Sequence, residues 1–312
     1  MTDTAGSGIQ VAYLGPEASY THQAALSSFA SEKHELIACP SIASVFTSVR
    51  SGKTEYGIVP FENSSNGAVL PTLDLLAGLI TQQPALEITS EAFVDVHHSL
   101  LARPNADGSD PPLSSIKTLY SHPQAWGQCG LFLDARLPNA EHLDVGSTSA
   151  AAARVAASAP GSGEAAIASA LAGQVYGLCT LRSSIEDRPD NQTRFLVLRQ
   201  RRQRGDDHVN AVKGTTTTKT LLHFRVPVHE HPGALADALA VFKHRGLTLT
   251  SMYTRPDPAA QVVAGTARWR YIFFVEFQTN VGDGHEDRGA EALEELAAVT
   301  RDLTVCGTWS SR

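Results

Sequence analysis

Apolar residues recur along residues 9–198 with two different spacings, which predict strands alternating with helices. Short apolar runs fit buried strands, expected at 9–14, 35–39, 56–60, 92–96, 116–119, 165–168 and 195–198. Helices are expected from residue 19, from 41 and from 71, and over 123–133, 149–157 and 169–175. The clearest helix has Ser41 as its cap, followed by Ile42, Val45, Phe46 and Val49 on one face. Such an alternation is typical of a parallel or mixed α/β sheet.

A second unit follows a polar interruption. Residues 199–219 have too few apolar positions to form a core, and we interpret them as a linker or an exposed hairpin. Beyond them the pattern predicts strand, helix, strand, strand, helix and strand, at 220–228, 233–245, 247–253, 269–278, 289–300 and 303–307. That order is βαββαβ, which is typical of a ferredoxin-like small domain.

The composition is that of an ordinary globular protein. The chain has 312 residues, 42% of them hydrophobic and 18% charged, which is enough for two or three compact units. A formal net charge of −7 argues against binding to nucleic acid. The four cysteines are too scattered for a zinc site or a disulfide framework, standing at Cys39, Cys129, Cys179 and Cys306.

No segment indicates export or a membrane span. Residues 1–10 carry neither an apolar core nor a basic amphipathic pattern, so no targeting peptide is expected. No apolar run is long enough to cross a bilayer. We therefore expect a soluble, cytoplasmic protein that does not bind membranes.

Polar clusters stand where the predicted strands begin or end. The most suggestive is Asn-Gln-Thr-Arg-Phe at 191–195, which runs into an apolar strand, and others stand at 19–22, 62–65, 121–124 and 147–149. In open α/β sheets, ligands bind beyond the carboxyl ends of strands, and helix N-termini there offer backbone donors to anions. Each cluster alone is explained by a helix cap or a surface turn. Together they predict a cleft that binds a small anion through hydrogen bonds and without a metal.

Several other kinds of site are excluded. The chain has no Gly-x-Gly-x-x-Gly after a strand, no phosphate-binding loop ending in Gly-Lys-Ser/Thr and no Gly-x-Ser-x-Gly elbow. His97 and His98 are neighbours in a predicted strand, so their side chains would point to opposite faces. This favours structural roles for both histidines.

These motifs, in this order, resemble those of prephenate dehydratases. The resemblance includes Leu-Gly-Pro-Glu-Ala-Ser-Tyr-Thr-His-Gln-Ala at 14–24, Gly-Ile-Val-Pro-Phe-Glu-Asn-Ser at 57–64, Ser-His-Pro-Gln at 121–124, Ser-Thr-Ser-Ala-Ala at 147–151 and the motif at 191–195. The small domain resembles the ACT regulatory domain attached to these enzymes, through Pro-Gly-Ala-Leu at 232–235 and Arg-Pro at 255–256. The resemblance covers nearly the whole chain.

The resemblance implies a two-lobed catalytic region with a fold like that of periplasmic binding proteins. The expected catalytic domain spans 8–200. Within it, lobe one comprises 8–92 plus 190–200, and lobe two comprises 93–189. A linker is expected at 201–219 and the ACT domain at 220–312. The implied reaction converts prephenate to phenylpyruvate, water and carbon dioxide in phenylalanine biosynthesis, without a cofactor. The resemblance also implies an enzyme without a fused chorismate mutase.

By the same resemblance, Thr193 acts at the departing hydroxyl of the substrate. A threonine hydroxyl is a very weak acid, so we expect a hydrogen-bond donor whose acidity depends on its neighbours. Glu62 is either the ultimate proton source or a cap, and Arg194 either holds a carboxylate or braces its loop. The other residues expected to bind prephenate are Thr21, Asn63, Ser64, Ser121, His122, Gln124, Gln128, Ser147, Thr148, Asn191 and Phe195.

Regulation by L-phenylalanine is expected in the small domain, at Gly233, Ala234, Leu235, Tyr253, Thr254, Arg255 and Pro256. Many relatives have Glu-Ser at positions 253–254, and that Glu belongs to the effector site between subunits, so Tyr253 is a departure that bears on feedback. Ala18 is a second departure, because the family usually has glycine there and a positive φ would strain alanine. ACT domains commonly pair edge to edge, so we expect a homodimer or homotetramer.

Three alternative functions share parts of this pattern. An arogenate dehydratase would use the same scaffold on an amino analogue of prephenate. A non-catalytic two-lobed protein that binds a small anion would explain the polar cleft, but such proteins are usually exported and have no need of Thr193. A free-standing regulatory ACT protein would leave most of the chain unexplained. An assay with prephenate and with arogenate separates these functions.

Overall fold

The computed structural model describes residues 8–31, 33–78, 86–201, 217–227, 232–257, 270–280 and 288–311. The chain divides into two compact units: unit 1 is Met1–Val45, Ile58–Gly67 and Ala92–Phe195, and unit 2 is Phe46–Gly57, Ala68–Glu91 and Leu196–Arg312. Unit 2 therefore joins the residues of the small domain to parts of the expected catalytic region. The expected domain boundaries stay a prediction, and most of the expected linker lies outside the described residues.

The N-terminal half of the chain forms strands and helices that, apart from β4, the apolar pattern predicts. They are β1 (Ile9–Leu14), α1 (Tyr20–Ser28), β2 (His34–Cys39), α2 (Ile42–Arg50), β3 (Tyr56–Asn63), β4 (Gly67–Ala68), α3 (Leu70–Gly78) and, later in the chain, β11 (Gln192–Gln200). β1 has the predicted bounds and runs parallel to β2, with Val11 opposite Leu36. The strand order along this path is β11-β3-β1-β2, with β4 paired to β3. Helix α1 begins where the Ser19 side chain accepts a hydrogen bond from the His22 amide.

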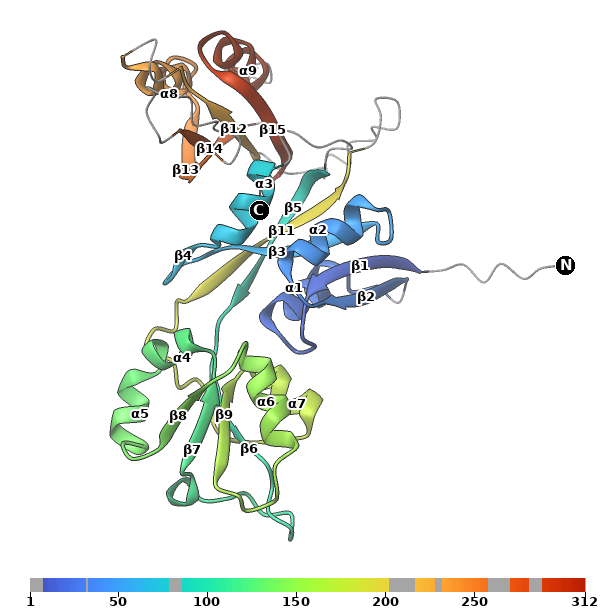
Figure 1. Cartoon of the computed structure of the whole chain (residues 1–312), viewed down its shortest axis with the longest axis vertical. Helices are drawn as coiled ribbons and strands as arrows, with labels where there is room; N and C mark the ends of the chain where they lie inside the picture. Colours follow the sequence, from blue (N-terminus) through green and yellow to red (C-terminus); the bar gives the residue numbers. More distant parts are fainter. Residues whose placement is uncertain are drawn as a thin grey trace, which may run out of the picture. The chain divides into compact units, whose positions relative to one another are not determined.

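A separate five-stranded sheet in unit 1 has helices on both faces. Its elements are β6 (Ser99–Ala102), η2 (Leu113–Ser115), β7 (Thr118–Ser121), α4 (Pro123–Gln128), α5 (Gly130–Arg136), β8 (Glu141–Asp144), α6 (Thr148–Ala156), β9 (Glu164–Ala168), α7 (Ala170–Tyr176) and β10 (Cys179–Arg182). The strand order is β10-β6-β9-β7-β8. Leu100 packs with Leu133 of α5, whereas its neighbour Leu101 packs with Ala152 of α6. Because strand neighbours point to opposite faces, α4 and α5 cover one face and α6 and α7 the other (Figure 1).

Two chain segments lead from the first set of strands to the five-stranded sheet. Residues 96–98 connect β5 (Leu86–Asp95) to β6, and residues 183–191 connect β10 to β11. The Val96 amide donates to the Asn191 carbonyl at 2.8 Å, and the Ile185 amide donates to the His98 carbonyl at 2.9 Å. This double crossing is the connection that a two-lobed α/β fold requires, so the predicted fold class is confirmed.

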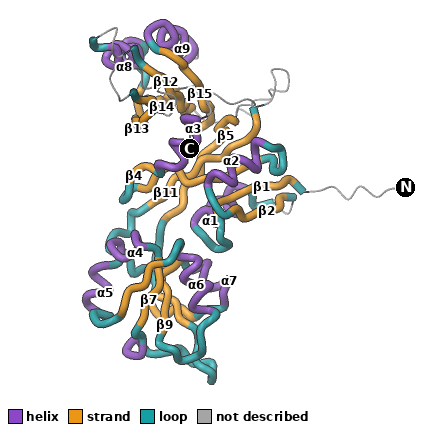
Figure 2. The backbone as a smooth tube through the Cα atoms, viewed as in Figure 1, coloured by secondary structure: helices purple, strands orange, loops and turns teal. Residues whose placement is uncertain are grey.

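The small domain in unit 2 has the predicted βαββαβ order. Its elements are β12 (Thr217–Arg225), α8 (Ala234–His244), β13 (Thr248–Pro256), β14 (Tyr271–Asn280), α9 (Arg288–Val299) and β15 (Arg301–Ser310). The strand order β13-β14-β12-β15 places the first and third strands in the centre, as in ferredoxin-like sheets. Helices α8 and α9 lie side by side (Figure 2), and Phe242 and Leu296 pack with Phe224 and Phe277 of the sheet.

A glycine lets β15 approach β5 within unit 2. Gly307 pairs in parallel with Ile88, and a Cβ atom on Gly307 would lie only 2.1 Å from the Ile88 carbonyl oxygen. Any other residue would therefore force the two backbones apart. Nearby, Lys219 of β12 forms a salt bridge of 3.0 Å with Glu91 of β5, whose side chain is 2% exposed. Unit 2 thus combines β5 with the small-domain strands through a backbone contact and a shielded charge pair.

The observed elements differ from the predicted ones where polar residues enter regular structure. β3 continues to Asn63 and β11 begins at Gln192, so residues expected beside these strands lie within them. The helix expected at 123–133 is two helices, because Cys129 leaves the helical conformation with φ −126° and ψ 19°. Strands β4, β6, β8 and β10, which have two to four residues, lie outside the predicted strands. His97 and His98 lie between β5 and β6 rather than in a strand.

His223 on β12 makes unit 2 sensitive to acid. Its side chain is fully buried, and neither ring nitrogen has a hydrogen-bond partner among the described residues. Burial, followed by the nearby Arg225 cation, lowers the pKa of His223 to about 4, whereas a histidine in an unfolded chain has a pKa near 6.5. The unfolded chain therefore takes up a proton at a higher pH than the folded chain does.

We predict that His223 alone lowers the free energy of unfolding by about 3 kcal/mol as the pH falls from about 6.5 to about 4. Its stabilising effect is present above the pKa of the unfolded state and is lost towards the pKa of the folded state. Denaturant unfolding at a series of pH values measures the loss, and His223→Phe removes it because phenylalanine binds no proton. The same pH dependence in both proteins would contradict the prediction.

Candidate active site

The carboxamide of Asn63, at the end of β3, is the centre of a hydrogen-bonded cluster. Its Nδ2 donates to Asn191 Oδ1 at 2.9 Å and to Thr193 Oγ1 at 2.9 Å. Its Oδ1 accepts from the backbone amides of Ser65 at 3.0 Å and Asn66 at 2.9 Å. Since those amides can only donate, they select the orientation in which the NH2 group of Asn63 faces β11.

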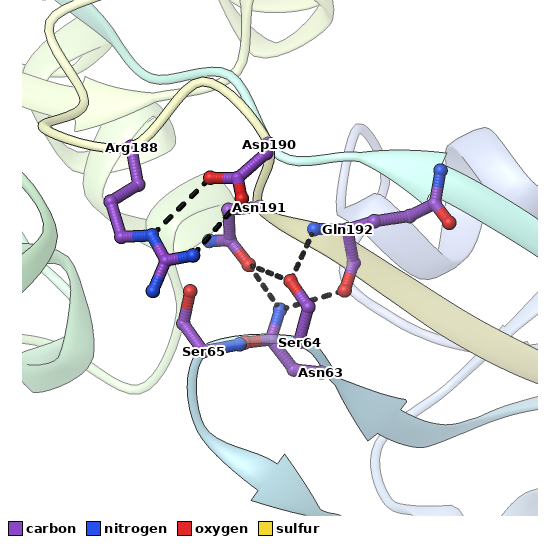
Figure 3. Close-up of polar contacts among 7 residues, drawn as sticks. All are labelled: Asn63, Ser64, Ser65, Arg188, Asp190, Asn191 and Gln192. Carbon is purple, nitrogen blue, oxygen red and sulfur yellow. Dashed lines mark hydrogen bonds and ion pairs between the residues drawn. The ribbon is translucent and has the colours of Figure 1, made fainter.

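Ser64 makes a second connection between the turn after β3 and the start of β11. Its amide donates to the Gln192 carbonyl at 2.9 Å, and the Gln192 amide donates to the Ser64 hydroxyl at 2.9 Å. The Ser64 hydroxyl donates in turn to Asn191 Oδ1 at 3.3 Å. Figure 3 shows Asn63 and Ser64 facing Asn191 and Gln192 across these two segments. Because Asn191 is only 2% exposed, its bonds in this cluster are shielded from water.

Polar side chains also hold the segment that leads into β11. Gln192 Nε2 donates to Asp95 Oδ1 at 2.7 Å, which connects the two crossing segments. Arg188 and Asp190 form an ion pair of 3.0 Å with side chains 68% and 67% exposed (Figure 3). A pair so open to solvent contributes little to stability. The rigidity of the cluster therefore comes from its amide and hydroxyl contacts.

Thr193 lies in this cluster with its hydroxyl oriented by Asn63. The Thr193 oxygen accepts the bond from Asn63, and its own proton has no acceptor among the described residues. A hydrogen bond donated to a hydroxyl oxygen stabilises negative charge there, so the hydroxyl becomes a better donor. Thr193 is half-buried, which leaves part of the residue accessible. The arrangement provides a polarised hydrogen-bond donor, the Thr193 hydroxyl, whose oxygen is held in place by Asn63.

Three further predicted residues lie close to Thr193 and Asn63 in the sequence: Arg194, Phe195 and Glu62. Phe195 is 1% and Arg194 8% exposed, and the Arg194 guanidinium carbon lies 5.3 Å from the centre of the Phe61 ring. This cation–π contact favours the bracing role for Arg194. Glu62 lies inside β3 and not at the start of a helix, so the capping role does not apply. As a strand neighbour of Asn63, it points to the opposite face.

At the corner between β7 and α4, three predicted residues make local contacts. Ser121 is fully buried, and its hydroxyl donates to the Ile167 carbonyl at 2.8 Å. His122 caps α4, with its Nδ1 accepting from the Gln124 amide at 3.3 Å. Burial lowers the pKa of His122, which keeps the ring neutral as an acceptor at pH 7. Gln124 itself is exposed.

Four other residues predicted to bind substrate lie on helices α1, α4 and α6 or cap them. Ser147 caps α6, where its hydroxyl accepts from the Ala150 amide at 3.0 Å. Thr148 follows as the first residue of α6 and is half-buried. Thr21 lies in α1 and is 5% exposed. Gln128, at the end of α4, accepts a hydrogen bond from the His98 ring at 2.7 Å.

Ala18 has the backbone conformation that glycine would favour. Its φ is 61°, and the residue is 1% exposed. The Ala18 amide donates to His22 Nδ1 at 3.0 Å, which holds the loop in this conformation. The position therefore does need a positive φ, and alanine accepts the strain of the left-handed region there.

The residues expected to bind L-phenylalanine lie on two elements of unit 2. Gly233 caps α8 with φ 90°, a conformation suited to glycine. Ala234 and Leu235 pack the first turn of α8 against the small-domain core. On β13, Arg255 donates two hydrogen bonds to the Asp74 carboxylate of α3. The other predicted residues on β13 are Tyr253, Thr254 and Pro256.

Sequence reasoning misses two residues of this region, Gln192 and His98. Gln192 stands in the motif at 191–195 without a predicted role of its own, and His98 has no local signal, because the partners of both residues come from distant parts of the chain. Within the described ranges, no group of three or more His, Cys, Asp and Glu side chains is placed to hold a metal ion. No helix in the part of the chain that the structure describes is long and apolar enough to cross a membrane.

Comparison with known proteins establishes the family. A family model described as prephenate dehydratase matches residues 11–203. The bifunctional chorismate mutase/prephenate dehydratase of Neisseria gonorrhoeae is 35% identical over 295 residues, which are 95% of this chain and 73% of that protein. The protein of the same name from Aquifex aeolicus is 35% identical over 301 residues, which are 96% of this chain and 73% of that protein. The chain belongs to the prephenate dehydratase family.

Solved structures of prephenate dehydratases share the fold of this chain. The prephenate dehydratase of Arthrobacter aurescens in complex with L-Phe is 29% identical, with a TM-score of 0.79 over 97% of this chain and 90% of that one. The prephenate dehydratase of Staphylococcus aureus is 25% identical, with a TM-score of 0.71 over 96% of this chain and 100% of that one. A quorum-quenching acylase, 24% identical with a TM-score of 0.77 over 97% and 98%, shares the fold alone.

Proposed function

We propose that this chain catalyses the decarboxylating dehydration of prephenate to phenylpyruvate, a carbon–oxygen lyase reaction, with Thr193 acting on the leaving hydroxyl. The observation that carries the proposal is the hydrogen bond of 2.9 Å from Asn63 to the Thr193 oxygen. This bond leaves the Thr193 proton available to a ligand. Membership of the prephenate dehydratase family supports the assigned reaction, and the hydrogen-bonded cluster supports the assigned location of the active site at Thr193.

The reaction balances with the substrate and a proton alone. The ring carbon–oxygen bond breaks, and the hydroxyl group takes up a proton and leaves as water. The bond between the ring and its carboxylate breaks at the opposite position, and carbon dioxide leaves. The electron pair of that bond enters the ring and completes the aromatic system. Because aromatisation drives the elimination, the protein has to orient the dianion and assist the departing oxygen.

Thr193 assists by donating a hydrogen bond to an oxygen that becomes more negative as its bond to carbon breaks. Its oxygen is held before substrate binds, because the Ser65 and Asn66 amides fix the Asn63 carboxamide. A preorganised donor stabilises developing charge without reorienting first, and so lowers the barrier. Glu62 stays our candidate for the ultimate proton source, acting through solvent from the opposite face of β3.

Donors for the two substrate carboxylates are proposed at helix α6 and helix α4. Thr148 is the first residue of α6, where backbone amides and the helix dipole favour an anion. Gln124 and Gln128 carry amide donors at the start and the end of α4. We assign supporting roles to residues whose side chains bond to the protein or lie buried in it: Thr21, Ser64, Ser121, His122, Ser147, Asn191, Arg194 and Phe195.

Regulation by L-phenylalanine in the small domain is part of the proposal. Its support is the similar A. aurescens protein in complex with L-Phe, together with Gly233 and Arg255 of the expected motif. Arg255 is bonded to Asp74 of α3, so a ligand that engages Arg255 acts on this pair. We further propose that the enzyme is a homodimer or homotetramer of the cytoplasm.

Thr193→Ala is predicted to lower kcat by about 10²–10⁴-fold, because the donor to the leaving oxygen is lost. Thr193→Ser keeps the hydroxyl and should retain part of the activity. Phenylpyruvate formation from prephenate measures the rates, and circular dichroism checks that the variants fold. Near-normal turnover by the alanine variant would sink the assignment of Thr193. Conversion of arogenate to phenylalanine, without turnover of prephenate, would reassign the substrate.

Calorimetry with millimolar L-phenylalanine should show binding heat, and the same ligand should slow the reaction. Arg255→Ala should weaken both effects, because it removes the arginine of the expected effector motif. Arg245→Ala is the matched control, since Arg245 pairs with Glu291 and Glu295 elsewhere in the small domain. The regulatory proposal fails if the wild-type protein gives neither heat nor inhibition.

A further inference from the structure

His98 lies in a buried chain of hydrogen bonds that ends at Gln128. The residue is 2% exposed. Its Nε2 is 2.7 Å from Gln128 Oε1, and its Nδ1 is 3.2 Å from the Tyr20 hydroxyl. The Tyr20 hydroxyl also donates to the His97 carbonyl at 2.7 Å. The chain therefore runs from α1, through the crossing segment at 96–98, to the last residue of α4.

These contacts select one tautomer of His98. Because Gln128 Oε1 can only accept, His98 Nε2 carries the ring proton. The Tyr20 hydroxyl gives its single proton to the His97 carbonyl, and its oxygen lies 3.2 Å from the bare Nδ1 of His98. Burial raises the pKa of Tyr20 above its ordinary value and lowers the pKa of His98. At pH 7 the phenol therefore keeps its proton, and the imidazole is neutral.

Glu186 fixes the backbone that carries His98. One carboxylate oxygen accepts from the His98 amide at 2.8 Å, and the other lies 2.7 Å from Nδ1 of His97. Burial opposes ionisation of Glu186, but the hydrogen bonds outweigh it, so its pKa lies below the ordinary value. With the His98 carbonyl also bonded to the Ile185 amide at 2.9 Å, the residue is held on both sides.

His98 thereby determines which end of the Gln128 carboxamide is available. Gln128 Oε1 is occupied by His98, whereas its Nε2 has no hydrogen-bond partner among the described residues. Gln128 is half-buried, and its carbonyl accepts from the Asp187 amide at 2.7 Å, which anchors the end of α4. An amide NH2 group can only donate and suits a carboxylate, whereas the rotated amide would present an oxygen and repel it.

We infer that His98 is a positioning residue for the dehydration: it holds the Gln128 carboxamide with the NH2 group directed to a substrate carboxylate. The inference rests on the proposed function, because it refines the role of Gln128 in binding prephenate. His98 itself does not contact the substrate. Its effect on the reaction passes through Gln128.

Steady-state kinetics with prephenate tests the inference. His98→Leu frees the Gln128 amide to rotate and should raise KM about tenfold with little change in kcat. His98→Gln keeps an amide donor near the position of Nε2 and should restore most of the affinity. Gln128→Glu places a carboxylate oxygen where the NH2 group was, so KM should rise further. His244→Ala, at the exposed end of α8, is the control, and it should leave KM unchanged.

A double-mutant cycle separates positioning from a general structural role. In a Gln128→Ala background, His98→Leu should raise KM no further, because the group that it orients is absent. Equal effects of His98→Leu in both backgrounds would overturn the inference. So would a wild-type KM for Gln128→Glu, since the exposed end of the amide would then be the acceptor. Thermal unfolding of each variant confirms that only folded proteins are compared.

Nitrogen NMR of the imidazole ring of His98 reports its tautomer, and through it the orientation of the Gln128 amide, without a measurement of enzyme activity. The inference predicts a neutral His98 with the proton on Nε2. A proton on Nδ1 in the wild-type protein would overturn it. Absence of prephenate turnover in the wild-type enzyme would instead refute the proposed function, and the NMR result would still decide the orientation of Gln128.

Discussion

The hydrogen bonds of the Asn63 carboxamide are the interaction on which this site depends. Asn63 and Thr193 are 130 positions apart in the sequence, yet a bond of 2.9 Å joins them where β3 ends and β11 begins. An amide is suited to this place because one end donates to β11 while the other accepts from two turn amides. A carboxylate of the same shape has no donor, so aspartate would leave Asn191 and Thr193 facing an acceptor.

The capping interpretation of the polar clusters holds at several residues, and the ligand-binding interpretation stays a prediction for the others. Ser147 and His122 cap helices, and Ser121 is bonded within the sheet, as the simpler interpretation requires. Their contacts fix the segments that carry Thr148, Gln124 and Gln128. Polar residues at strand ends therefore serve the site mainly by holding a few donors in place. This division follows from the cost of leaving a buried polar group unpaired.

Much of the fold follows from local pattern, and β1 has the predicted bounds because its apolar run ends at Gly15-Pro16. The βαββαβ order of the small domain is likewise predictable from its periodicity. Local pattern fails where a contact joins distant segments. The extension of β3 to Asn63 depends on β11, and the role of His98 depends on α1 and α4. The motif of Arg194 likewise does not predict its surroundings, because its guanidinium packs on Phe61 of β3, which is distant in the sequence.

In the mechanism proposed here, Asn63 assists the reaction by polarising the hydroxyl of Thr193. A double-mutant cycle on kcat with prephenate tests it most directly, using Asn63→Ala and Thr193→Ala alone and together. We expect that Asn63→Ala slows turnover strongly in the wild-type background and adds nothing once Thr193 is alanine. Independent, multiplicative losses of kcat from the two substitutions would contradict it.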